Sequence, residues 1–164
     1  MNAVFAIFLL PFLIFTQSQF DDNQNWRQIV PLKSSRTDVE GLLGPTQQAF
    51  FATYQLKEGN LFIEYSSGPC TEERKGGWNV PKDVVISVSF SPKRKRRIAA
   101  IKLASKKFRK VIDQHVVGIT YYINDKDGIT YQVQEGKIDS VEYGPTKRDG
   151  HLYCGHQAAK KVPY

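Results

Sequence analysis

An unbroken apolar run stands at the start of the chain. It covers Ala3 to Phe15, and polar and acidic residues follow it directly. A helix that spans a bilayer needs about 20 apolar residues, and this run is shorter. Its length is typical of the apolar region of a secretory signal peptide. The run therefore predicts an export signal that forms no part of the folded domain; an uncleaved anchor and a buried core segment are the alternative interpretations.

Small residues lie where a signal peptidase would need them. Cleavage before Gln19 places Thr16 and Ser18 at the two small-residue positions of the cleavage site. We therefore expect residues 1–18 to be the signal peptide and residues 19–164 to form one mature domain. No cysteine follows the apolar run directly, so the expected product is a periplasmic or secreted protein and not a lipoprotein.

The first half of the mature chain predicts one short helix and several strands. The helix begins after Ser35, which has the capping-box spacing to Asp38, and it ends at the glycine and proline of positions 44 and 45. Its apolar residues Val39, Leu42 and Leu43 share one face. A short strand that Pro31 stops is predicted over residues 26–30, and alternating residues predict further strands over residues 50–56, 61–65 and 84–90.

A sequence repeat connects the two halves. Residues 54–59 (YQLKEG) return as residues 131–136 (YQVQEG), and each copy leads to a strand ending in Glu-Tyr and then to a Gly-Pro pair. A second amphipathic helix is predicted after Ser105, with Phe108, Val111 and Ile112 facing inward. These features predict two similar helix-plus-hairpin halves, residues 26–92 and 98–154, joined by a basic connector at residues 93–97. Alternatively, hairpins of similar register share such residues for packing reasons alone.

The predicted fold is α+β: a twisted antiparallel β-sheet with two short helices on one face. One strand of the second half breaks the alternation, because Ile138 and Val141 fall on opposite faces of it. A β-bulge, or burial of both faces, is needed there.

The segment that opens the first helix resembles a known family. It reads Ile29-x-Pro31-Leu32-x-Ser34-x-Arg36-x-Asp38-Val39-x-x-Leu42-Leu43-Gly44-Pro45. This is similar to the BamE (SmpA/OmlA) and beta-lactamase-inhibitor-protein-like group, in which such a helix precedes antiparallel strands. The resemblance implies a small exported bacterial protein that has no catalytic site and binds other proteins through its sheet surface. The chain lacks the lipidated cysteine of the family's lipoprotein branch.

Charge adds a local feature to this picture. The chain has 23 Lys and Arg against 16 Asp and Glu, but ten of the basic residues and none of the acidic ones lie in residues 93–110. The remainder carries 13 basic and 16 acidic residues, so the net charge of +7 comes from this segment. An exported protein is not expected to meet nucleic acid, and aromatic residues are not interleaved with these cations as single-strand binding requires.

Two interpretations of the basic segment remain open. One is a solvated connector followed by a helix whose cations face outward. The other is a salt-sensitive contact with anionic lipid headgroups, acidic polysaccharide or an acidic protein. The candidate anion-binding residues are Lys93, Arg94, Lys95, Arg96, Arg97, Lys106, Lys107, Arg109 and Lys110.

Cys70 and Cys154 are the only cysteines, and export takes them to a compartment where disulfides persist. We expect one disulfide between them; the alternative is two free thiols packed as small apolar residues. His151, Cys154 and His156 have a weak metal-ligand spacing, but the disulfide would consume the thiol. No metal and no other cofactor is therefore expected.

The sequence contains no recognisable catalytic motif. It has no nucleophile elbow, zinc-protease motif or nucleotide-binding loop, and residues 125–128 (DKDG) favour a hairpin turn over a calcium loop. We expect an exported non-catalytic domain that binds an envelope or secreted protein or associates with the envelope. The alternative is a peripheral binder of anionic membrane or polysaccharide through residues 93–110.

Overall fold

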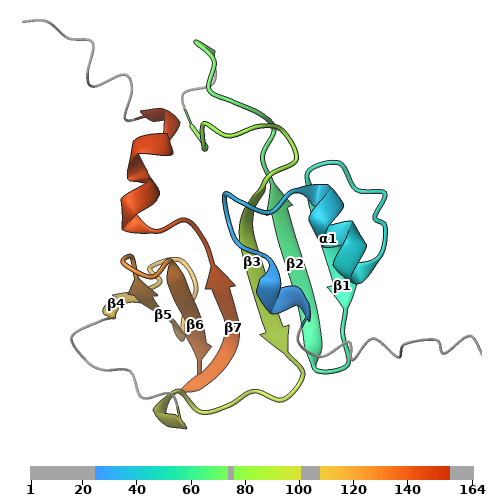
Figure 1. The fold of residues 1–164 in the computed structure, drawn as a ribbon. Coiled ribbons are helices and arrows are strands. Elements are labelled where there is room, and N and C mark those ends of the chain that lie inside the picture. Colours follow the sequence, from blue (N-terminus) through green and yellow to red (C-terminus); the bar gives the residue numbers. More distant parts are fainter. Residues whose placement is uncertain (1–24, 74–75, 101–107, 156–164) are drawn as a thin grey trace, which may run out of the picture.

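The computed structural model describes residues 25–73, 76–100 and 108–155. Seven strands form one antiparallel sheet in the order β1-β2-β3-β7-β6-β5-β4 (Figure 1). The strands are β1 (Phe51–Gln55), β2 (Gly59–Tyr65), β3 (Val85–Pro92), β4 (Arg109–Ile112), β5 (Ile119–Asn124), β6 (Ile129–Gln134) and β7 (Lys137–Tyr143). The helices are α1 (Arg36–Leu43) and the short 3-10 helices η1 (Asn25–Gln28), η2 (Ile98–Ala100) and η3 (Lys147–Leu152). The fold is thus α+β, with β-structure predominating.

Helix α1 begins and ends where the sequence predicts. The Ser35 hydroxyl accepts a hydrogen bond from the N–H of Asp38 at 3.2 Å, and the Asp38 carboxylate accepts one from the N–H of Ser35 at 2.7 Å. These reciprocal bonds form a capping box, and they hold the pKa of Asp38 below its ordinary value. Gly44 ends the helix with a φ of 93°, a conformation that favours glycine.

The hydrophobic core lies between the helices and one face of β1–β3. Figure 1 shows α1 and η1 on the same side of these strands. Every second residue of β2, including Leu61 and Ile63, is buried on this face, and Val39 of α1 packs against them. The alternation that predicted a hairpin is therefore also the pattern of burial, and the β1–β2 hairpin is confirmed.

The prediction of a strand over residues 26–30 is wrong. Asn25–Gln28 form the 3-10 helix η1, from which Trp26 stacks on Phe90 with 5.1 Å between ring centroids. Residues three apart lie on one side of a 3-10 helix but on opposite sides of a strand. The helical conformation therefore lets both Trp26 and Ile29 enter the core.

The prediction of a second helix is wrong where the structure describes it. Residues 109–112 form β4, which pairs antiparallel with β5 from Arg109↔Ile123 to Ile112↔Thr120. Val111 and Ile112 are β-branched, and β5 offers them a backbone partner, so a strand is favoured. The start of the predicted helix, at residues 105–107, lies outside the described residues. The second half thus has no counterpart of α1 at residues 109–112, and the internal repeat stays a prediction.

The predicted β-bulge lies in β7. Gln132 of β6 pairs with Ser140, but the next residue, Val133, pairs with Ile138. Asp139 is therefore an extra residue in β7, and beyond it the alternation of faces is reversed. As a result, Ile138 and Val141 lie on the same face. Strand β7 then pairs with β3 through Val88↔Tyr143, Ser89↔Glu142 and Phe90↔Val141, which joins the two halves into one sheet.

The C-terminal part of the described chain is fastened to the loop before β3. A disulfide joins Cys70 to Cys154, as the sequence predicts, with 5.6 Å between the Cα atoms. Next to it, the N–H of Asn79 donates to the carbonyl of Leu152 at 2.7 Å. Trp78 packs edge to face against Tyr153, with ring centroids 5.5 Å apart.

Among the described residues, none of the helices has the length and apolarity to span a membrane.

Candidate functional site

The segment from Lys93 to Arg97, here named the basic end, lies at one end of the sheet where β3 stops. Its backbone is hydrogen-bonded to the β1–β2 turn and to strand β7. The N–H of Lys93 donates to the carbonyl of Glu58 at 2.7 Å, and the carbonyl of Arg96 accepts from the N–H of Ile138 at 2.8 Å. Arg97 also forms a β-bridge with Lys137. The backbone of the basic end is therefore held at both of its ends, at Lys93 and at Arg96 and Arg97.

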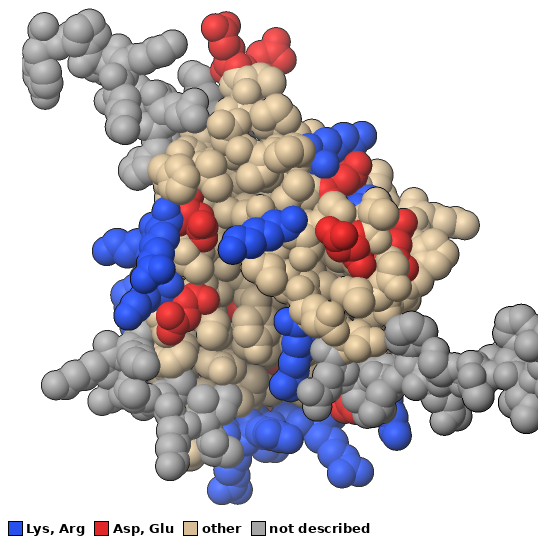
Figure 2. Space-filling model, in the orientation of Figure 1, with Lys and Arg blue, Asp and Glu red and all other residues tan. Residues whose placement is uncertain are grey.

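All five side chains of the basic end are exposed. Lys95 forms an ion pair with Asp139, the bulge residue of β7, and the Nζ of Lys93 donates to the carbonyl of Leu56 at 3.0 Å. No ion pair between described residues involves any of the three arginines at 94, 96 and 97. Figure 2 shows Lys and Arg side chains gathered at the lower end of the molecule, below the sheet. This end therefore presents concentrated positive charge to solvent.

Among the described residues, the candidate cations Arg109 and Lys110 do not extend this cluster. Arg109 and Lys110 are neighbours in β4, so their side chains project from opposite faces of the sheet. The Arg109 guanidinium forms an ion pair with the Asp125 carboxylate, with 3.7 Å between nitrogen and oxygen. Asp125 follows the end of β5 that is farther from the basic end. The expected helix face with Lys106, Lys107, Arg109 and Lys110 outward is thus wrong for the last two residues. Lys106 and Lys107 lie outside the described residues.

The β4–β5 turn forms an apolar tip at the same end of the sheet. The side chains of Ile112, Val116 and Val117 are 65%, 48% and 97% exposed, and these three residues are here named the apolar tip. Strand register places the tip: Ile119 follows the turn and pairs with Gln134, and Gln134 pairs with Lys137. Lys137 is the residue that bridges to Arg97, so the tip and the basic end share one edge of the molecule.

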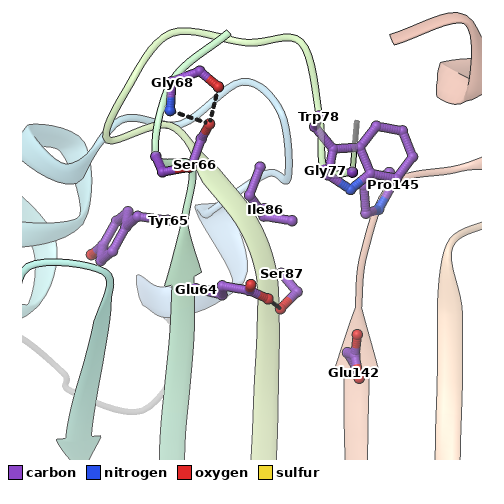
Figure 3. Close-up of a pocket in the computed structure, with 12 residues that line it drawn as sticks. Glu64, Tyr65, Ser66, Gly68, Gly77, Trp78, Ile86, Ser87, Glu142 and Pro145 are labelled. Carbon is purple, nitrogen blue, oxygen red and sulfur yellow. Dashed lines mark hydrogen bonds between the residues drawn. The ribbon is translucent and has the colours of Figure 1, made fainter. Parts of the chain in front are cut away.

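A hollow of about 400 Å³ opens at the other end of the sheet (Figure 3). Glu64, Ser87 and Glu142 come from three neighbouring strands, and Trp78 and Pro145 come from loops. The Ser87 hydroxyl donates to the Glu64 carboxylate at 3.3 Å. The described residues of the chain bring no three His, Cys, Asp or Glu side chains together as metal ligands.

Desolvation in the hollow, together with the negative charge of Glu64, raises the pKa of Glu142 above its ordinary value. The ionised form of Glu142 is therefore disfavoured in the folded protein. At a pH below the ordinary pKa, Glu142 is protonated in both the folded and the unfolded protein, and the free energy of unfolding is not reduced. As the pH rises toward the higher folded-state pKa, Glu142 ionises more readily in the unfolded protein, and the free energy of unfolding falls. The hollow is thus a place where negative charge gathers without a counter-ion among the described residues that line it.

Glu142→Gln should remove the destabilisation that ionisation of Glu142 causes at neutral pH. The glutamine cannot ionise, so the variant should gain thermal stability relative to wild type as the pH is raised from 4 to 7. Thermal unfolding followed by circular dichroism at both pH values measures this. Glu142→Asp, which keeps an ionisable carboxyl group at the same position, is the matched control and should keep a loss of stability at the higher pH. An identical pH dependence for Glu142→Gln and wild type would contradict the prediction.

The remaining sequence candidates are placed separately. His151 Nδ1 lies 2.9 Å from the carbonyl oxygen of Arg148, Cys154 is bonded to Cys70, and His156 lies outside the described residues. Residues 125–128 form the turn between β5 and β6, as predicted, with the Asn124 amide donating to the Asp127 carboxylate at 2.8 Å.

Sequence reasoning missed the apolar tip and the hollow. Ile112 was expected to face the core from a helix, so its exposure on a strand was not foreseen. The adjacent valines at 116 and 117 precede Gly118 between two strands, which is the available signal for an apolar turn. The hollow depends on β2, β3 and β7 being neighbours, and the sequence gives no signal of that order.

Comparison with known proteins finds no match to a family model, to a curated protein or to a solved structure.

Proposed function

We propose that this protein is an exported, non-catalytic domain that associates with the envelope by binding an anionic surface through its basic end. The observation that carries the proposal is the fixed backbone of residues 93–97 with all five basic side chains exposed. Lys and Arg near an anionic lipid surface each contribute about 1 kcal/mol, and the attraction fades within a Debye length of about 8 Å at physiological salt. Five such residues side by side suit contact with a flat array of negative charges.

The fixed backbone strengthens this argument. Binding through a mobile basic tail loses conformational entropy when the tail becomes ordered. Here the hydrogen bonds to Glu58 and Ile138 already hold the segment, so the cations meet the surface without that loss. The ion pair with Asp139 neutralises Lys95 in part, which leaves the three arginines as the main attractive charges.

Export rests on two observations of different kinds. The apolar run at residues 3–15 has the length of a signal-peptide core. The disulfide between Cys70 and Cys154 suits the oxidising compartment to which such a signal leads. Both support a periplasmic or secreted location, in which nucleic acid is not the expected anion.

The triple substitution Arg94→Ala/Arg96→Ala/Arg97→Ala tests the proposal. The experiment uses protein recovered after export. At low salt, wild type should co-sediment with phosphatidylglycerol vesicles and be retained on heparin. Both interactions should weaken at roughly 0.5 M salt, because salt screens the charges. The triple variant should bind roughly 100-fold more weakly. The matched control is Lys126→Ala/Lys147→Ala/Arg148→Ala, which removes equal charge from exposed residues elsewhere and should have a much smaller effect. Failure of wild type to bind either material at low salt would refute the proposal.

Protein binding through the open sheet face is a second candidate function, favoured by three exposed phenylalanines. Phe51 and Phe62 stack with ring centroids 5.6 Å apart on the face that α1 does not cover, and Phe50 is exposed beside them. Exposed aromatic clusters of this kind mark protein-interaction surfaces. The order of α1 followed by antiparallel strands fits the BamE-like resemblance, which implies a non-catalytic protein binder.

A further inference from the structure

The apolar tip presents hydrophobic surface where a soluble turn would ordinarily be polar. Val117 is almost wholly exposed, Val116 precedes it in the same turn, and Ile112 is the last residue of β4 before the turn. Large apolar side chains that remain in water after folding need an explanation when several of them gather at one place. Gly118, with a φ of 84°, completes the turn and leaves the valines at its apex.

Several backbone groups of this turn are hydrogen-bonded within the turn itself. The Asp113 carboxylate accepts hydrogen bonds from the N–H groups of His115 and Val116, at 2.8 and 3.0 Å. The N–H of Asp113 donates to the carbonyl of Ile119 at 3.1 Å. Moving an unpaired backbone group out of water costs several kcal/mol, roughly, so a turn that pairs its own N–H groups enters an apolar medium at lower cost. Val116 and Val117 are thus exposed on a hydrogen-bonded turn that also carries the exposed polar side chains of Gln114 and His115.

The tip and the basic end lie close enough to touch one surface together. From Arg97 the register passes across β7 and β6 to β5, which is about 15 Å at the usual spacing of strands. Both project from the same end of the sheet, and neither covers the other. An amphipathic surface results, with cations on one side and apolar side chains on the other.

We propose that this end of the protein docks on a phospholipid bilayer, with the apolar tip inserted between lipids and the basic end on anionic headgroups. This inference rests on the proposed function and names its anionic surface. A polysaccharide offers negative charge but no hydrocarbon in which Val116 and Val117 could be buried. A bilayer offers negative charge at its headgroups and hydrocarbon directly beneath them. Interfacial segments of proteins bury apolar residues about 5–10 Å into this region.

The experiment compares wild type with three variants on vesicles with and without phosphatidylglycerol and on heparin. Val116→Ser/Val117→Ser keeps the charge of the protein and should reduce binding to anionic vesicles roughly 10- to 100-fold while leaving heparin retention unchanged. Val30→Ser, at an exposed valine of another region, is the matched control and should bind as wild type. Val117→Trp should bind vesicles more tightly than wild type, a gain that misfolding does not produce.

The outcomes separate the inference from the proposed function. If wild type binds heparin but not vesicles, the basic end binds polysaccharide and membrane docking is overturned. If the serine variant binds vesicles as wild type while the arginine triple variant does not, binding is electrostatic only and the insertion of the tip is overturned. If wild type binds neither material, the proposed function fails and the inference fails with it.

Discussion

Loss of the Cys70–Cys154 disulfide is expected to lower the free energy of unfolding by roughly 4 to 5 kcal/mol. The bond closes a loop with a sequence separation of 84 residues, so it restricts the unfolded chain far more than the folded one. A domain of this size is stable by about 5–15 kcal/mol in total, so the loss is a large share. Urea unfolding of wild type with and without reductant, and of Cys70→Ser/Cys154→Ser, measures it.

The double serine variant also supplies the control for this experiment. Reductant should leave its unfolding midpoint unchanged, because no disulfide remains to be reduced. The native contacts around the bond, including that of Asn79 with Leu152, should keep the fold, so the variant should retain its circular dichroism spectrum. Equal midpoints for wild type with and without reductant would show that the bond does not stabilise the folded protein.

The disulfide and the basic end lie at opposite ends of the sheet. Cys70 belongs to the loop that follows β2, whereas Lys93 follows β3, and the two strands are antiparallel neighbours. Reduction should therefore weaken the fold without removing cations from the proposed contact surface. In an envelope the same bond would secure the part of the domain that faces away from the anionic surface.

Elements with local signals were predictable from the sequence. Ser35 and Asp38 carry the capping box within four residues, and Gly44 marks the end of α1, so the helix needs no tertiary information. The β1–β2 hairpin likewise follows from alternation on both sides of a short turn. The bulge at Asp139 was predictable because apolar residues on a strand that breaks the period of two must be reconciled with one buried face.

Elements decided by tertiary partners were not predictable. Phe108, Val111 and Ile112 have helical spacing, yet the open edge of β5 takes residues 109–112 as a strand. Three apolar residues in so short a segment are weak evidence for a helix, and the available strand partner decides the structure instead. Trp26 of η1 is likewise buried because its ring packs against those of Phe90 and Tyr143, which lie far from it in the sequence.

The candidate site was predictable in composition and not in layout. The cations from Lys93 to Arg97 stand out in the sequence, but their exposure on a fixed backbone depends on bonds to Glu58 and Ile138. Their neighbourhood with the apolar tip depends on the register of β5, β6 and β7. Glu64 and Glu142 lie at the other end of the sheet, and their proximity likewise depends on β2, β3 and β7 being neighbours.

Leu61→Ala is expected to lower the free energy of unfolding by about 2–5 kcal/mol. Leu61 is fully buried in the centre of the core between α1 and the sheet, where it packs with Val39 and Ile63. Removing its isobutyl group takes away buried apolar surface and leaves a cavity that the surrounding strands can close only in part. Urea unfolding of the variant and of wild type measures the change as a lower unfolding midpoint with an unchanged m-value.

Phe62→Ala is the matched control, because Phe62 is the next residue of the same strand but projects from the opposite face, where it is 42% exposed. Although it removes a larger side chain, the control should destabilise the protein by less than about 1 kcal/mol, since its loss leaves no enclosed cavity. A Phe62→Ala change as large as that of Leu61→Ala would mean that both faces of β2 are buried. If Phe62→Ala changes the free energy of unfolding only slightly, the variant is folded and lacks one phenylalanine of the exposed cluster. This variant can then test protein binding through the open sheet face without disturbing the core.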